Sequence, residues 1–444
     1  MTGIGTAIVM GGVQTPFRRN IAHRPHFDKS KVKFEPPVIV EPKINAPRTI
    51  SLGRRLDKET GDDMGPFYLP IDDISHEPSL LIEGGPGTGK SVCIARIFSE
   101  MIYEGRSGIL CDFKGQYATM SNPNRNEKHL KILNEFGEVP RGLGEIDVWL
   151  PNHIVDRKGE DYCKFKYGYN KRYIIRTEDM DAGGMLLLGG KATEGKDYVM
   201  LLDTVLATLK KGAREGLVEF TLDTIIDELN TLKEDVDGTK RSVDVLQIML
   251  HNMITTGVIA DKGTDIFELI DKPNKHGKSG KVSIFNTGAA GPDDIQSKGV
   301  MANFISGLCN SLMTEWEVVN GERINAYRPI LFIDEASTYF NSYSSNMVMS
   351  AFNLLQYVDG RTLGICRGYV YQNTAQMPKN LKDSDSMPIY IKLQQFLDLV
   401  DLQGNVVGQI NRPGLAKVSI KNVSFMQNQD FYVQILPPKC DIGS

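Results

Sequence analysis

The sequence lacks the marks of a membrane, secreted or zinc-binding protein. No apolar run approaches the roughly 18 residues that span a bilayer, and the short apolar stretch at residues 4–10 has no basic segment before it, as a signal peptide would have. The six cysteines are scattered, with no C-x-x-C pair and no cysteine–histidine cluster. This pattern favours reduced thiols over disulfides or a zinc site. We therefore expect a cytoplasmic protein with no membrane span.

An excess of charge of one sign is also missing. The net charge is −4 over 444 residues, so a surface that binds nucleic acid would have to be local. The hydrophobic fraction of 41% and the charged fraction of 24% are ordinary for a globular protein with a real core. The length fits about two to three domains, or one enlarged domain with insertions.

A complete phosphate-binding loop of the form G-x-x-x-x-G-K-[ST] lies within residues 83–91, which read EGGPGTGKS. An apolar strand at 79–82 precedes it, and residues 92–103 follow with the apolar spacing of a helix. Glycine lets backbone N–H groups turn inward around phosphate oxygens, and the helix N-terminus adds its positive dipole end. Since strand, turn and helix are in the required order, the loop predicts binding of a nucleoside triphosphate.

Two residues of this loop have predicted tasks of their own. Lys90 should reach the β and γ phosphates, and the Ser91 hydroxyl should bind Mg²⁺. The alternative is a glycine-rich turn that binds nothing, which fits this context poorly. The predicted nucleotide contacts run from the first glycine into the helix: Gly84, Gly85, Pro86, Gly87, Thr88, Gly89, Lys90, Ser91 and Val92.

A second acidic feature follows the apolar strand at 330–333, where Asp334 and Glu335 stand side by side. In a P-loop enzyme Asp334 would hold Mg²⁺ together with Ser91, and Glu335 would orient or deprotonate the attacking water. Alone, such a pair is more often a strand leaving the core. Beside a phosphate-binding loop it predicts hydrolysis rather than binding alone.

The distance between the two halves of the site selects among P-loop families. More than half of the chain separates Lys90 from Asp334, which a compact AAA+ module would not need. A transporter-type ATPase would carry a Leu-Ser-Gly-Gly-Gln signature between them, and none is present. The intervening residues are therefore predicted to form an insertion or an accessory subdomain.

Four segments together resemble the HerA/FtsK superfamily, nearest to the HerA-type ATPases, over most of residues 50–400. They are the phosphate-binding loop, the Asp-Glu pair and two others. Residues 112–117 read DFKGQY and are similar to the family's Asp-x-x-Gly-Glu-Tyr, with Gln116 in place of the acid. Residues 360–364, GRTLG, resemble the family's Gly-Arg-x-x-Gly, and a strand at 369–371 follows and ends at Gln372, with Tyr371 where the family has Thr.

This resemblance implies a homohexamer that hydrolyses ATP between subunits and drives double-stranded DNA, independently of sequence, through a central channel. Gln372 would contact the γ-phosphate or the water; the alternative is a solvated amide. Arg361 would enter the neighbouring subunit's site as an arginine finger. The alternatives are a surface salt bridge for Arg361 and Arg367 as the finger.

Two basic segments could contact DNA phosphates, although such segments are more often solvated faces. The first includes Lys272, Lys275, Lys278 and Lys281, and the second includes Lys210, Lys211 and Arg214. No helix-turn-helix or zinc finger is present, so sequence-specific reading is not expected. The family often carries an N-terminal β-barrel, which looks absent or reduced here. That departure weakens a nuclease partnership and leaves room for a mobile-element partner.

The expected fold is α/β: a RecA-like (ASCE) P-loop NTPase core with a mainly helical insertion, a short N-terminal region and a small C-terminal β extension. Helices are expected at 199–209, 222–232, 243–253 and 293–318. The expected parts are a basic, proline-rich and flexible arm at 1–50 (or a nucleic-acid or subunit contact), a β region at 51–77, the core at 78–118 and 276–400, an insertion at 119–275 that is irregular and then helical, and the β extension at 401–444.

The leading functional hypothesis is a ring-forming DNA translocase or helicase of HerA/FtsK type, used in DNA end processing, conjugation, segregation or packaging. Two alternatives stay open. One is a secretion-type ATPase that moves protein. The other is a nucleotide-dependent assembly switch that hydrolyses slowly.

Overall fold

The structure is a computed structural model that describes residues 49–71, 79–180, 182–189, 196–235, 239–273, 279–286, 288–290, 295–319, 322–340, 353–355, 363–378, 388–401, 403–421 and 429–443. The arm predicted at 1–50 lies outside these residues except for its last two, which begin a strand. No described helix is both long and apolar enough to cross a membrane.

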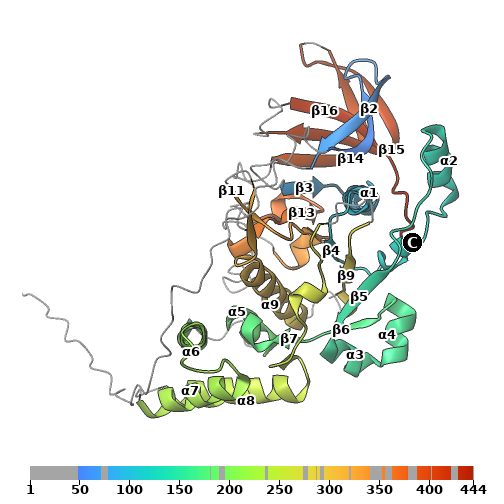
Figure 1. Ribbon diagram of the computed structural model, residues 1–444. Helices are drawn as coiled ribbons and strands as arrows, with labels where there is room; N and C mark the ends of the chain where they lie inside the picture. Colours follow the sequence, from blue (N-terminus) through green and yellow to red (C-terminus); the bar gives the residue numbers. More distant parts are fainter. Residues whose placement is uncertain are drawn as a thin grey trace, which may run out of the picture. The chain divides into compact units, whose positions relative to one another are not determined.

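A sheet of twelve strands dominates the described chain (Figure 1), in the order β2-β1-β16-β15-β14-β3-β13-β12-β4-β9-β5-β6. All pairings from β14 to β6 are parallel. The parallel strands are β14 (Ile389–Val400), β3 (Ser79–Glu83), β13 (Cys366–Tyr371), β12 (Ile330–Ile333), β4 (Gly108–Cys111), β9 (Val282–Phe285), β5 (Ile146–Pro151) and β6 (Lys171–Tyr173).

The strand order identifies the fold. One strand, β13, lies between β3, which leads into the phosphate-binding loop, and β12, which leads into Asp334. This is the RecA-like P-loop NTPase arrangement, and it confirms the predicted fold class. Every residue of β3, β4, β9, β12 and β13 is buried. Strands covered on both faces need such near-continuous apolar runs, which the sequence supplies.

Alternate residues of these strands enter two separate cores, as the period of a strand requires. Leu80 and Phe332 belong to the core that includes helix α1 (Lys90–Tyr103), whereas Leu81 and Leu331 belong to the core that includes α9 (Ile295–Leu312) and α5 (Ala182–Leu188). Helices therefore cover both faces of the parallel sheet.

The three helices predicted in the insertion are present and longer than expected. They are α6 (Lys196–Arg214), α7 (Leu222–Asp235) and α8 (Lys240–Thr255). Buried leucine, isoleucine and valine side chains from all three join one core cluster, because the apolar residues recur at helical spacing.

Two local predictions were wrong. The stretch expected to be irregular contains α2 (Glu127–Glu135), α3 (Asn152–Lys158) and α4 (Glu160–Tyr167), besides the short pair β7 (Ile175–Arg176) and β8 (Ile259–Ala260). Helix α2 buries only Leu133, so apolar periodicity could not indicate it; Asn126 caps it by accepting from two backbone amides. The long helix expected to reach 318 ends at Leu312, because β10 (Trp316–Val319) pairs with β11 (Glu322–Asn325) as a hairpin.

The remaining strands extend the sheet in antiparallel pairing beyond β14. They are β15 (Val406–Ile420), β16 (Gln429–Ile435), β1 (Thr49–Leu56) and β2 (Asp63–Pro70). Strand β14 joins the two parts, since it is parallel to β3 and antiparallel to β15. The N-terminal and C-terminal β regions thus meet in one continuous extension, which we call the antiparallel extension.

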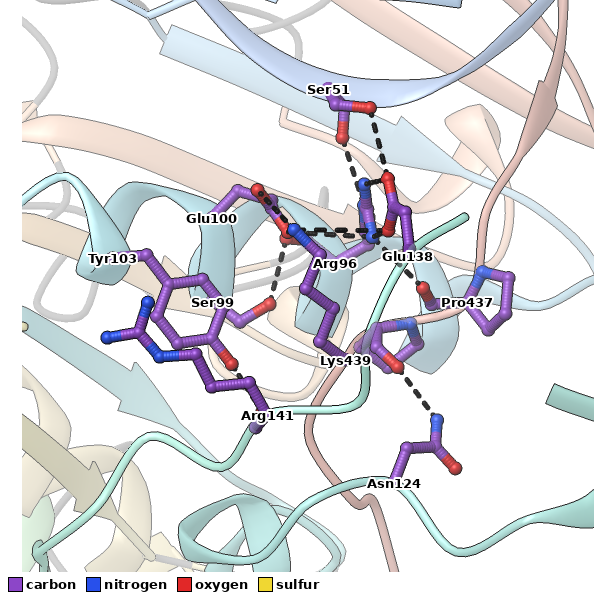
Figure 2. Close-up of polar contacts among 11 residues, drawn as sticks. Ser51, Arg96, Ser99, Glu100, Tyr103, Asn124, Glu138, Arg141, Pro437 and Lys439 are labelled. Atoms are coloured by element: carbon purple, nitrogen blue, oxygen red, sulfur yellow. Dashed lines mark hydrogen bonds and ion pairs between the residues drawn. The ribbon is translucent and has the colours of Figure 1, made fainter. Parts of the chain in front are cut away.

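A buried arginine ties helix α1 to three distant segments (Figure 2). Arg96 is 0% exposed, and its Nη1 and Nη2 donate to the carboxylate of Glu138 at 2.5 and 2.7 Å. Its Nε donates to the carbonyl of Ser51 at 2.9 Å, and Nη1 also reaches the carbonyl of Pro437 at 3.3 Å. Lys439 adds an ion pair to Glu100 of the same helix at 3.1 Å. The helix that starts at the phosphate-binding loop is therefore fixed by charge as well as by apolar packing.

This network predicts an acid-sensitive stability. Although burial opposes its charge, hydrogen bonds from Arg96 hold the pKa of Glu138 below the ordinary 4.5. The stabilisation is therefore complete above pH 4.5 and is lost as the pH falls through the lower folded-state pKa. Glu138→Gln leaves Arg96 buried without its counter-charge and should lower the free energy of unfolding by about 3 kcal/mol at neutral pH. Urea unfolding at neutral and acidic pH measures both effects.

The matched control is Glu127→Gln, an exposed position on α2. It should change the free energy of unfolding by less than about 0.5 kcal/mol at any pH. Equal stability of the two variants at neutral pH would contradict the role given to the Arg96–Glu138 pair.

Candidate functional site

The phosphate-binding loop connects β3 to α1 and adopts the turn that its glycines allow. Gly89 has φ 95° and stands directly before the first residue of α1, a conformation that residues with a side chain rarely adopt. A Cβ on Gly84 would lie 2.4 Å from the Thr88 hydroxyl, which donates to the Gly85 carbonyl at 2.8 Å. A Cβ on Gly87 or Gly89 would meet no atom within 4 Å. The inner face of the loop is thus closely packed, while space beside these two glycines is open.

Lys90 is held against the loop that precedes it. Its Nζ donates to the carbonyls of Gly84 at 2.7 Å and Gly85 at 3.0 Å, and the residue is 8% exposed. Burial lowers its pKa, and so does the nearby charge of Lys114; the carboxylates of Asp334 and Glu335 act in the opposite direction. Of the other predicted contacts, Pro86 is exposed, and Thr88, Ser91 and Val92 are half-buried.

Gln116, to which the sequence analysis assigned no role, connects Asp334 to Ser91 through hydrogen bonds. The Gln116 Nε2 donates to the Ser91 hydroxyl at 2.7 Å and to the Asp334 carboxylate at 3.3 Å. The Tyr117 hydroxyl donates to the same carboxylate oxygen at 3.0 Å. Asp334 is 1% exposed, and burial together with the charge of Glu335 raises its pKa. The two predicted magnesium ligands thus share one neighbour, and the buried carboxylate lies where a cation would stabilise its charge.

Glu335 lies next to Gln372, and both of its carboxylate oxygens are engaged. Gln372 Nε2 donates to Oε2 at 3.1 Å, and Lys114 Nζ donates to Oε1 at 2.6 Å. Glu335 is 5% exposed and has φ 48° and ψ 46°, the left-handed region that disfavours residues other than glycine. Its backbone N–H donates to the Asp334 carboxylate at 2.9 Å, which favours this conformation. Such strain often occurs where a side chain must be aimed into a site.

The segment 112–117 supplies most of the residues that sequence reasoning missed. Asp112 follows β4 directly and accepts from the backbone amides of Lys114 at 3.0 Å, Gly115 at 2.7 Å and Tyr117 at 3.0 Å. This turn needs φ +75° at Gly115 and sends the next two side chains to Ser91 and Asp334. Burial is the main reason that the pKa of Asp112 rises to about 6. The signal was the Asp-x-x-Gly-x-Tyr pattern, which located the segment without giving its contacts.

The structure describes only Arg367 of the two candidate arginine fingers. Arg361 lies outside the described residues, so its role stays a prediction. Arg367 is 6% exposed; its Nε donates to the Ser79 hydroxyl at 3.0 Å, and its Nη1 donates to the Leu355 carbonyl. Its guanidinium group is therefore committed to the core of its own chain, which argues against a role in a neighbouring subunit.

The two predicted basic segments are partly committed to neighbours in the chain. Lys272 lies 5.3 Å from the centre of the Tyr327 ring, and Lys281 pairs with Asp147 at 3.9 Å. The other two lysines of that segment, Lys275 and Lys278, lie outside the described residues. In the second segment Lys210 donates to the Met180 carbonyl at 3.0 Å, while Lys211 and Arg214 are exposed in the last turn of α6.

No family model matches the sequence, and no curated protein matches it. Among solved structures, a VirB4 structure from Thermoanaerobacter pseudethanolicus is 13% identical, with a TM-score of 0.46 over 88% of this chain and 97% of that one. The unbound conjugative coupling protein TrwBΔN70 is 13% identical, with a TM-score of 0.45 over 89% and 97%. TrwB in complex with the GTP analogue GDPNP is 14% identical, with a TM-score of 0.45 over 89% and 98%.

These likenesses are too weak to carry an argument about activity or subfamily. The strand order and the loop geometry define the class instead: the chain has the fold and the phosphate-binding loop of a P-loop NTPase. The resemblance to HerA-type proteins in particular stays a prediction.

The position of Lys90 predicts the effect of its removal. Lys90→Ala removes the ammonium group. In the wild type, this group would exchange its hydrogen bonds to the Gly84 and Gly85 carbonyls for hydrogen bonds to phosphate oxygens when nucleotide binds. We expect nucleotide affinity to fall by about a hundredfold or more, since a charge-assisted hydrogen bond contributes about 1.5 to 3 kcal/mol and more than one is lost. Calorimetry with ATP measures this. Lys131→Ala, an exposed lysine on α2, is the control and should bind as the wild type does; unchanged affinity in Lys90→Ala would remove the lysine from the phosphate site.

Proposed function

We propose that this chain is an ATPase that couples ATP hydrolysis to the movement of double-stranded DNA, as a ring-forming translocase of HerA/FtsK type. The observation that carries the ATPase proposal is the hydrogen-bonded chain from Ser91 through Gln116 to Asp334. It unites residues that the sequence separates by more than half its length. The charges of Asp334 and Glu335 raise the pKa of Lys90, in opposition to burial. The loop and the two acids are therefore close enough to interact electrostatically.

The phosphates of ATP would bind along the loop residues predicted from the sequence, Gly84 to Val92. Backbone amides at the start of α1 and the ammonium of Lys90 would supply the donors. Gly87 and Gly89, which have positive φ, fit this ligand. The space beside them is open, and a side chain at either position would fill the space that the phosphates would occupy. Lys90 would exchange its two carbonyl acceptors for phosphate oxygens of higher charge.

The residues also fit Mg²⁺, which prefers oxygen ligands and keeps several waters. The Ser91 hydroxyl and the Asp334 carboxylate would hold the ion between them. Among the described residues no group of three or more His, Cys, Asp or Glu could hold a metal. The site would therefore need nucleotide phosphates to complete the coordination. When bound, the ion would neutralise charge on the phosphates.

Glu335 would orient the attacking water and accept its proton, with Gln372 holding one carboxylate oxygen in place. The Lys114 ammonium donates to the other oxygen, and departure of Lys114 would free that oxygen to accept a proton from water. Lys114 is 48% exposed and has a long, flexible side chain, whereas Glu335 is fixed by burial. Phosphates entering the site would attract the lysine away from the carboxylate. Binding of substrate would then release Glu335 from this ion pair.

The DNA-coupled part of the proposal rests on the resemblance of segments 112–117 and 360–372 to the HerA/FtsK superfamily. A homohexamer would place each site at a subunit boundary, where Arg361 of the adjacent subunit would stabilise the transition state. No observation favours a protein substrate over DNA.

Glu335→Gln separates binding from turnover. The amide keeps the shape and the hydrogen bond to Gln372 but cannot accept a proton from water. We expect ATP affinity within about threefold of wild type and a loss of turnover of about a hundredfold or more. Steady-state phosphate release and ATP binding are the measurements. Glu104→Gln, an exposed position just after α1, is the control and should be fully active; near-normal turnover in Glu335→Gln would refute the base role.

Coupling to DNA is tested by ATP turnover with and without linear duplex DNA, combined with the mass of the assembly. We expect duplex DNA of any sequence to stimulate turnover and the assembly to have six subunits. Low turnover that ignores DNA, with assembly that follows nucleotide occupancy, would favour the assembly switch. High turnover that ignores DNA would favour a protein-moving ATPase.

A further inference from the structure

A groove of about 610 Å³ lies in the antiparallel extension, away from the residues of the nucleotide site. It lies between the end of β1 and the turn after it, the end of β15 and the start of β16. Of its seven described lining residues, three are cationic and one is acidic. The lining consists of Arg55, Lys58, Ile420, Lys421, Gln429, Asp430 and Phe431.

The acidic residue of the groove forms no ion pair with these three cations. Asp430 is already paired with Lys417 at 2.7 Å and accepts from the Ser419 hydroxyl at 2.6 Å. Although partial burial opposes its charge, these hydrogen bonds hold the pKa of Asp430 below its usual range. Within the described chain, Arg55, Lys58 and Lys421 form no ion pair, whereas Arg54 beside them is paired with Asp63 at 2.9 Å. The groove therefore carries an excess of positive charge.

Aromatic rings set the positions of two of these cations. The Arg55 guanidinium lies 5.3 Å from the centre of the Phe431 ring, and Lys58 Nζ lies 5.9 Å from the centre of the Tyr432 ring. Contact with a ring face restricts a long side chain without neutralising it. Less rotamer entropy is then lost when an anion binds.

The groove and the phosphate-binding loop share no described lining residue. Ile420 is opposite Ile389, which pairs with Leu80 near the start of β3. The loop follows Glu83 at the other end of β3. A ligand in the groove would thus contact residues different from those that would bind ATP.

We infer that this groove, which we call the basic groove, binds the phosphodiester backbone of a nucleic-acid strand. Its three exposed cations come from two separate segments, and its described lining residues include no buried donor that would read a base or enclose one phosphate. Charge without enclosure is what a sequence-independent backbone contact requires. The inference deepens the proposed function, because it locates a nucleic-acid contact on the chain proposed to move DNA.

The test is the salt dependence of duplex DNA binding by the full chain without nucleotide, followed by fluorescence anisotropy. The variant combines Arg55→Ala, Lys58→Ala and Lys421→Ala. Each lost phosphate contact lowers the slope of log affinity against log salt by about 0.9, so we expect the slope to fall by about 2 to 3. An unchanged slope would overturn the inference.

A matched control removes the same number and kinds of cation from exposed positions in and just before α2, with Arg125→Ala, Lys128→Ala and Lys131→Ala. Its slope should stay within about 0.5 of the wild-type value. If both triple variants lose the same slope, the effect is one of net charge and the basic groove is not the site. The charge-preserving variant Arg55→Lys, Lys58→Arg, Lys421→Arg should bind nearly as well as the wild type, and weak binding by this variant would contradict a contact based on charge.

Two further measurements distinguish backbone binding in the basic groove from a mononucleotide site and from the proposed ATPase function. Millimolar dAMP should leave the duplex bound, and displacement would indicate a mononucleotide site and overturn the inference. ATP turnover without DNA should be equal in wild type and both alanine variants, which also shows that they fold. If the wild type binds duplex DNA but hydrolyses no ATP, the proposed function fails while the inference stands. If it hydrolyses ATP but the groove variant keeps the wild-type slope, only the inference fails.

Discussion

The parallel register of β3, β13 and β12 is the constraint on which the site depends. Tyr371 pairs with Glu83 at the entry to the phosphate-binding loop, and Ile333 pairs with Tyr369 one step before Asp334. Because parallel strands end at the same edge, the loop, both acids and Gln372 are delivered to one place. The contacts through Gln116 and Lys114 complete the site across β4, which pairs with β12 in the same sense. A slip of one residue in β12 would turn Asp334 and Glu335 to the opposite faces.

Much of this arrangement could be predicted from the sequence. The loop at 83–91 is contiguous, and its chemistry is carried by residue type at fixed spacing. The Asp334–Glu335 pair follows four apolar residues, and the charges of both acids act on Lys90 of the loop, where they oppose the lowering of its pKa by burial. The fold class followed from alternating strands and helices. In each of these cases a local pattern determines a local structure. The parallel pairing of the strands then brings these local structures to the same edge of the sheet.

What could not be predicted depends on side chains that meet only in three dimensions. Gln116 was read as a departure from an acidic family position, yet its amide connects Ser91 to Asp334 because neutral donors can hydrogen-bond to both oxygens. The Lys114–Glu335 pair joins segments 221 residues apart. Helix α2 is held by a cap and by polar contacts, to which a search for apolar periodicity is blind. The basic groove likewise combines cations from both ends of the chain.

Strand β14 has a mechanical consequence. It pairs through Ile389 to Lys392 with all but the first residue of β3, and its Tyr390 hydroxyl donates to the Glu83 carboxylate. The other edge of β14 carries the whole antiparallel extension. Tension applied to that extension would reach the residue before the phosphate-binding loop through backbone hydrogen bonds loaded in shear, with no linker to absorb it. Strain and nucleotide occupancy would then influence each other over the width of only one strand.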